Sequence, residues 1–455
     1  MELTAQRVLL DLSLIGVLLL IGTYLRVKIR LLRRFLIPAA VVGGAIGLVL
    51  GPQVIGLIQI DSARMLGYAP VLLQVVFAGL FIGRRVPRPG EIIKIGGAQT
   101  AFAVIANFMQ IAIGMAVVLV FALFAVKLHP GFGMQLVLAF QGGVGIPTSF
   151  APMYEAMGWV AGEAQAVGET AAVAGLLLAI IVGIVLANVG ARRGFTENKV
   201  ESVSLKASSS LHSMDSRPSM GRAVVKSDAV SPLAYSFGFL GLALLSGYWL
   251  KGLAVTLYNP LKFVPPFAFA LVTGLLIQVV LQGSRLDAYV DRGSVMSLQG
   301  FALDVLIVAA ISALSLRVVV AFAAPLLVML AAGLLWSLWW VMWLAPRLLP
   351  GAWFEKALAE FGQGVGSAPS ALLLLRTVDP GLQTDAADAF AIKMFLTSPT
   401  MVPLMIAISS AITSRGPALI MLWMVGGSVA VYLLSLLVGW RQTRPGPSWS
   451  RAASG

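Results

Sequence analysis

The chain has 455 residues, of which 59% are apolar and 11% are charged, whereas roughly 25% are charged in an average soluble protein. This composition excludes a water-soluble globular protein. It predicts an all-α polytopic membrane protein, because each helical crossing needs about 20 mostly apolar residues. The chain has no cysteine and only two histidines, His129 and His212. Thiol chemistry is therefore excluded, and neither zinc nor haem is expected as a cofactor.

The apolar stretches follow one another along the chain. Eleven candidate crossings cover residues 8–24, 36–57, 68–83, 95–126, 165–189, 233–257, 263–281, 294–316, 318–345, 387–412 and 417–440. Two glycine-broken segments, 134–150 and 355–375, are predicted to be re-entrant or discontinuous. A serine-rich stretch with mixed charges, 190–231, is predicted to be a flexible cytoplasmic linker.

The basic residues indicate an orientation. The first apolar stretch is predicted to be a retained helix, because five basic residues follow it between positions 26 and 34. With the N-terminus outside and the C-terminus in the cytoplasm, 24 Lys and Arg residues fall in cytoplasmic segments, seven fall outside and Lys393 lies within a span. This asymmetry matches the rule that cytoplasmic loops are positive. It also explains the net charge of +13 without a nucleic-acid partner.

The two halves of the chain resemble each other at a near-constant offset. Gly143, Val144, Gly145 and Ser149 stand 221 residues before Gly364, Val365, Gly366 and Ser370. In the predicted topology the two repeats are inverted, which is the signature of a secondary transporter whose site forms where two broken segments meet. We predict a first repeat over 1–189, a second over 232–412, an extra transmembrane helix over 413–440 and a cytoplasmic tail over 441–455.

The two broken segments carry the candidate substrate-binding groups. Glycine and proline free backbone amides and carbonyls there, and a helix starting near Thr148 would point its amides at a substrate carboxylate. A reading in which the glycines only permit close helix packing stays open. The candidate substrate-binding residues are Gln141, Gly142, Gly143, Val144, Gly145, Thr148 and Ser149, then Gln363, Gly364, Val365, Gly366, Ser367 and Ser370, and finally Lys393, Thr397 and Ser398.

Ionisable groups inside apolar spans are costly and mark ion or substrate paths. Glu169, with Thr148 near it, is a candidate sodium ligand; the alternative is a carboxylate that only complements a helix N-terminus. Asp304 lies deepest in a span and is a candidate sodium or proton site. Lys393 either snorkels to the interface or faces a substrate carboxylate. Asp11, close to the outer interface, is expected to be a wet carboxylate without a function.

Other classes of protein find little support. The sequence has no Walker A loop for ATP and no nucleophile elbow, so we do not expect an enzyme. A channel, which would conduct without coupling, remains an alternative.

Two motifs also carry a family resemblance. QGGVGIPTS from Gln141 and GQGVGSAPS from Gly362, with the inverted-repeat frame and the linker, resemble the sodium/glutamate symporter family over about residues 5–412. The resemblance implies sodium-coupled uptake of glutamate, a homodimer in the inner membrane, and two re-entrant motifs. Family members commonly carry Gly-His-Gly-Thr in the first motif, and Val144 stands in place of that histidine. A sodium- or proton-coupled carrier of another organic anion therefore stays an alternative. The helix after residue 412 is a second departure.

Overall fold

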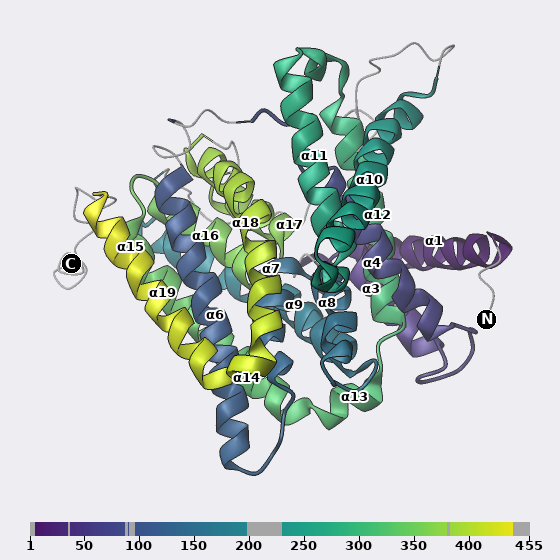
Figure 1. Cartoon of the computed structure of the whole chain (residues 1–455), viewed down its shortest axis with the longest axis horizontal. Helices are drawn as coiled ribbons and strands as arrows, with labels where there is room; N and C mark the ends of the chain where they lie inside the picture. The colour runs from purple at the N-terminus through teal and green to yellow at the C-terminus, as the bar shows by residue number, and fades with distance from the viewer. Residues whose placement is uncertain are drawn as a thin grey trace. The chain divides into compact units, whose positions relative to one another are not determined.

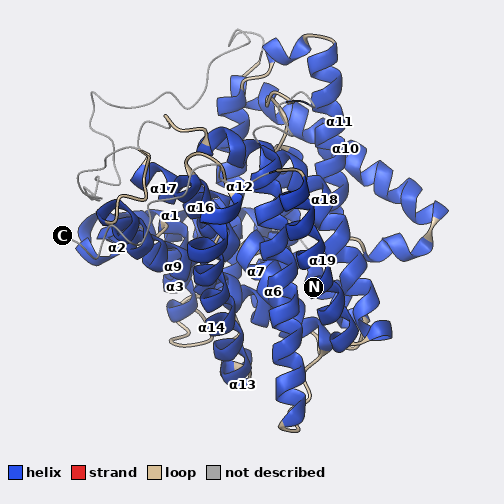
Figure 2. Ribbon diagram, turned by 90° about the vertical axis from the view of Figure 1, so that its left-hand side faces the viewer, coloured by secondary structure: helices blue, strands red, loops and turns tan. Residues whose placement is uncertain are grey.

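The computed structural model describes residues 5–34, 37–86, 90, 96–197, 230–379 and 383–439. All regular structure in these residues is helical (Figure 2), which confirms the predicted all-α class. Most of the predicted linker and the whole predicted tail lie outside the described residues. The longer helices are α1 (Ala5–Lys28), α3 (Ala39–Leu50), α4 (Ser62–Ala78), α6 (Gly97–Leu123), α7 (Gln135–Gly142), α8 (Gly145–Ala156), α9 (Glu163–Arg192), α10 (Pro232–Leu257), α11 (Pro266–Gly283), α12 (Arg292–Ser312), α14 (Ala323–Trp339), α16 (Trp353–Val365), α17 (Ala368–Val378), α18 (Ala386–Arg415) and α19 (Pro417–Leu437).

Nine of the helices in the described residues are long and apolar enough to cross a membrane. The helix at the predicted crossing 36–57 is shorter than expected, because α3 has 12 residues. Helix α4 has 17 residues but begins at Ser62, before the predicted crossing 68–83. At 1.5 Å per residue, α3 is about 18 Å long, against roughly 30 Å of hydrocarbon. Its end at Gly51 has a local reason, since the following Pro52 disfavours helical backbone at the residue before it.

The chain forms two compact units, and each draws on both halves of the sequence. Unit 1 comprises Met1–Val86, Val144–Glu169 and Ala207–Arg317, and unit 2 comprises Pro87–Gly143, Thr170–Lys206 and Val318–Gly455. The boundary at 143 and 144 coincides with the first glycine motif.

In unit 1, α12 packs against α3 and α4, while α1 packs against α3. Lipid tails are as apolar as leucine, so close packing of small residues stabilises such contacts. A side chain at Gly43 would clash with the backbone of Leu18 in α1. Asp11 is 7% exposed and accepts hydrogen bonds from Arg64 at 2.5 and 3.0 Å. The expectation of a wet carboxylate was wrong, because this ion pair joins α1 to α4.

In unit 2, the long helix α6 contacts α7, α14, α16, α18 and α19. Helix α19 runs alongside α6 (Figure 1), and Gly427 of α19 lies against the ring of Phe108. The extra C-terminal helix therefore packs on this unit along one face. Buried apolar side chains of α16, α17 and α18 form a core cluster in the same unit: Ala359, Ala371, Leu375, Ala386 and Phe390.

Candidate substrate and cation sites

The first broken segment is interrupted at Gly143. Helix α7 ends at Gly142 and α8 begins at Gly145, three residues before Thr148 and thus earlier than expected. Gly143 has a φ of 61° and a ψ of −159°, a conformation that glycine adopts without the strain other residues would suffer. A glycine at this position therefore permits the break.

The second broken segment lies next to the first within unit 2. Helix α16 ends at Val365 and α17 begins at Ala368, and Ser367 between them is extended. A Cβ built on Gly143 would lie 3.9 Å from Ser367 Cβ and 4.0 Å from the Gly366 carbonyl oxygen. The two helix breaks, 221 residues apart in sequence, are therefore side by side.

A polar side chain of α6 joins the two motifs. Gln110 is fully buried, and its Nε2 donates a hydrogen bond to the Gly364 carbonyl at 2.6 Å. Gln141 donates in turn to Gln110 Oε1 at 3.3 Å. Gln110 thus satisfies a carbonyl near the end of α16, a position where helices leave carbonyls without intrahelical partners.

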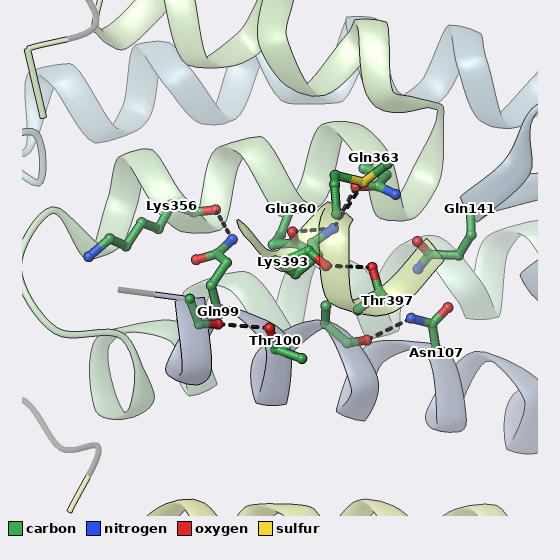
Figure 3. A network of polar contacts seen from close by, with 12 residues as sticks. Gln99, Thr100, Asn107, Gln141, Lys356, Glu360, Gln363, Lys393 and Thr397 are labelled. Carbon is green, nitrogen blue, oxygen red and sulfur yellow. Dashed lines mark hydrogen bonds and ion pairs between the residues drawn. The ribbon is translucent and has the colours of Figure 1, made fainter. Parts of the chain in front are cut away.

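Lys393 is bound by side chains of its own unit (Figure 3). Its Nζ lies 2.6 Å from Glu360 Oε1 and donates to Gln363 Oε1 at 2.5 Å. The ammonium also lies 4.7 Å from the centre of the Phe390 ring. Lys393 and Glu360 are each 1% exposed, so this ammonium neither reaches water nor stands unpaired before a substrate. Thr397 Oγ1 donates to the Lys393 carbonyl at 2.9 Å.

A second carboxylate is buried in unit 1. Glu169, 1% exposed, accepts at Oε1 from Thr148 Oγ1 and from Gln165 Nε2, both at 2.9 Å. The Thr148 hydroxyl is also 2.8 Å from the Val144 carbonyl, and its one proton serves one acceptor at a time. Glu169 Oε2 has no hydrogen-bond partner, and no Lys or Arg forms an ion pair with it, among the described residues.

Asp304, the other predicted cation ligand, is exposed on α12. A Cβ built on Gly145 would lie 3.1 Å from Leu306 Cδ1, so the Leu306 face of α12 packs on the first motif. Two residues correspond to about 200° around a helix. Asp304 therefore points away from Gly145 and is not brought together with Glu169.

The predicted site residues are divided between the units. Unit 1 contains Val144, Gly145, Thr148, Ser149, Glu169 and Asp304. Unit 2 contains Gln141, Gly142, Gly143, Gln363, Gly364, Val365, Gly366, Ser367, Ser370, Lys393, Thr397 and Ser398. In unit 2 the hydroxyls of Ser367 and Ser370 are 3.2 Å apart.

Sequence reasoning missed Gln110 and Glu360. The available signal for the first was a set of amide side chains at helical spacing within one span, Gln99, Asn107 and Gln110, because polar residues inside spans face the protein interior. The signal for Glu360 was its position three residues before Gln363, which puts both on one helix face.

Comparison with known proteins identifies the family of this chain. A family model described as sodium/glutamate symporter matches residues 4–380. No curated protein matches the chain significantly. Helices α18 and α19, and with them Lys393, lie beyond the matched residues. Because the match covers most of the chain, the protein belongs to the sodium/glutamate symporter family.

Proposed function

We propose that this multi-pass membrane protein is a secondary active transporter that couples inward sodium movement to uptake of glutamate, or a related anionic amino acid or carboxylate, by alternating access. The observation that carries the proposal is the adjacency of the two helix breaks, with Gly143 beside Gly366 and Ser367. Broken helices freed from their backbone hydrogen bonds are the usual substrate sites of such carriers.

The substrate would bind at these breaks. Backbone amides at the start of α17, after Ser367, offer donors and a favourable dipole to a carboxylate. In this proposal the side-chain amides of Gln141 and Gln363 and the hydroxyls of Ser370 and Thr397 add specificity. The Lys393 ammonium is already paired with Glu360, so it does not serve as a counter-charge for the substrate. Neutral hydrogen-bond donors would bind the anion instead.

Sodium would bind at Glu169. Its Oε2 is buried without a partner among the described residues, and the Thr148 hydroxyl and the Val144 carbonyl lie beside its other oxygen. Oxygen ligands that include one carboxylate suit a hard monovalent cation, which would also remove the cost of an unpaired buried charge. Asp304 stays a predicted cation ligand at a separate place.

The setting of the carrier completes the proposal. We place it in the inner membrane as a homodimer, with the N-terminus outside and the C-terminus in the cytoplasm, in line with the 24 basic residues of the predicted cytoplasmic segments.

One residue favours a second candidate substrate. Val144 stands where family members commonly carry histidine, so a different organic anion, with sodium or protons as the coupling ion, is the alternative. Competition by a panel of dicarboxylates and amino acids during glutamate uptake distinguishes the two, since the preferred substrate competes at the lowest concentration.

Uptake into proteoliposomes tests the coupling. Labelled glutamate should accumulate against its gradient when sodium is high outside, and not when potassium replaces sodium at equal ionic strength. Accumulation that ignores the sodium gradient would disprove the coupling. Flux that only equilibrates glutamate, with currents above carrier turnover, would indicate a channel.

A further inference from the structure

The paired charges Glu360 and Lys393 lie beside the second break, not at a distant structural position. Glu360 precedes Gln363 by one helical turn in α16, and Lys393 reaches both from α18. Neither residue forms another ion pair within the described part of the chain. Because both are 1% exposed, each charge is balanced almost entirely by the other.

The groups around the ammonium are those of a cation site. Lys393 Nζ is held by a carboxylate oxygen of Glu360 at 2.6 Å and by an amide oxygen of Gln363 at 2.5 Å, and the Phe390 ring faces it at 4.7 Å. Carboxylate and amide oxygens are ligands that hard metal cations use in proteins, and the face of an aromatic ring also attracts cations.

The pair has no counterpart in the first half of the chain. At the 221-residue offset of the glycine motifs, Glu360 falls on Ala139 and Lys393 falls on Ala172. Both alanines are fully buried. Both charges are thus present in the second half, and both are replaced by alanine in the first half. The carboxylate and the ammonium therefore occur together, as one neutral pair.

The two buried carboxylates near the motifs are therefore treated differently. Glu169 has no ion-pair partner among the described residues, whereas the Lys393 ammonium lies 2.6 Å from Glu360 Oε1 and neutralises it. An unpaired carboxylate in a dry site attracts a cation strongly, and a carboxylate with a bound ammonium does not.

We propose that the Lys393 ammonium is a tethered cation that fills a sodium-type site formed by Glu360 and Gln363, so that of the two buried carboxylates near the motifs only Glu169 is left to bind sodium. The inference rests on the proposed function only in taking Glu169 as the sodium site. It predicts that removing the ammonium opens a second sodium site beside the second glycine motif.

Sodium titrations of thermal unfolding test this without a transport assay. The full chain is purified in detergent in a sodium buffer and is then exchanged into a potassium buffer. Its melting temperature is measured as a function of sodium concentration at constant ionic strength. Each bound ion adds a fixed increment of stability per tenfold increase in sodium above its dissociation constant. Lys393→Met keeps the apolar stem, and its sodium dependence should be about twice as steep as that of the parent protein.

The control is the double variant Glu360→Gln with Lys393→Met, which has no carboxylate to hold the second ion and should return to the parent slope. A Lys393→Met slope equal to that of the parent, or a variant that unfolds in sodium and potassium alike, overturns the tethered cation and leaves an ion pair that only stabilises the fold. If the parent shows no sodium response and Lys393→Met does, the Glu169 site fails while the tethered cation stands.

Discussion

Replacement of Glu169 by glutamine gives the sharpest test of the proposed sodium site. The amide oxygen of the new side chain still accepts from Thr148 and Gln165, which lie 2.9 Å from Oε1, so the hydrogen bonds and the packing persist. The variant removes one buried negative charge. We expect the protein to stay folded, because neutralising an unpaired buried charge does not destabilise the folded state.

The loss of sodium affinity follows from the burial of this carboxylate. Glu169 is 1% exposed, and removing one partner from a buried charge pair costs about 3–5 kcal/mol. At about 1.4 kcal/mol per factor of ten, the sodium dissociation constant should rise by at least roughly 100-fold. Sodium-dependent stabilisation and sodium-driven uptake should therefore both vanish at physiological sodium.

The assay combines sodium titration of the melting temperature with uptake in proteoliposomes. Glu163→Gln is the matched control, since it makes the same change on α9, at a side chain that is only partly buried and accepts from the Trp159 indole. An unchanged sodium dependence in Glu169→Gln, with the control also unchanged, would refute the assignment of sodium to this carboxylate.

Gln110→Leu leaves the buried Gly364 carbonyl without its donor, which should cost about 1–3 kcal/mol of folding stability and raise the KM for substrate; an unchanged KM would contradict the link between the motifs. Gly143→Ala forces a side chain into a backbone with φ of 61°, so uptake should fall and folding stability should drop by about 1–3 kcal/mol. The control is Gly158→Ala, at a φ of 95° in open space, which should keep its uptake. Burial alone would raise the pKa of Asp379, but hydrogen bonds from the Thr384 and Gln383 backbone and from the Thr384 hydroxyl outweigh it and hold that pKa below its ordinary value. The carboxylate therefore stabilises the fold at neutral pH and loses this effect as the pH falls below about 4, so the gap in melting temperature between the parent and Asp379→Asn should close in acid, and a constant gap would contradict this.

Local patterns predicted most of the fold. Apolar runs placed the long helices within a few residues, because a span must be continuous in lipid and therefore leaves a continuous signal. The two breaks were also predicted, since glycine at 143 and glycine with proline near 366 act on the backbone locally. The length of α3 was not predicted, because its apolar stretch continues beyond the helix end at Gly51. The start of α4 at Ser62 was not predicted either, because it lies before the apolar stretch that marked this crossing.

Site residues whose partners are far apart in sequence were harder to interpret. Glu169 and Thr148 lie 21 residues apart, within one motif and the helix that follows it, and the sequence grouped them correctly. Lys393 stood out as a lone charge, but its partner Glu360 lies 33 residues away on another helix. A hydropathy pattern identifies a costly charge without identifying what neutralises it. It also does not show which way a side chain points, so the depth of Asp304 in its span did not predict that this residue is exposed.

Neutralisation decides what a buried carboxylate can do. Glu360 with its own ammonium keeps the same charge through any movement of unit 2, because both partners belong to that unit. Glu169 has no such partner among the described residues, so its burial is favourable only when a cation or a proton arrives. A carrier that must move only when loaded needs at least one unpaired buried carboxylate such as Glu169. A second unpaired carboxylate would require a second ion in each transport cycle. Lys393 removes that demand at Glu360, which makes the number of sodium ions bound a direct measure of how many carboxylates the chain leaves open.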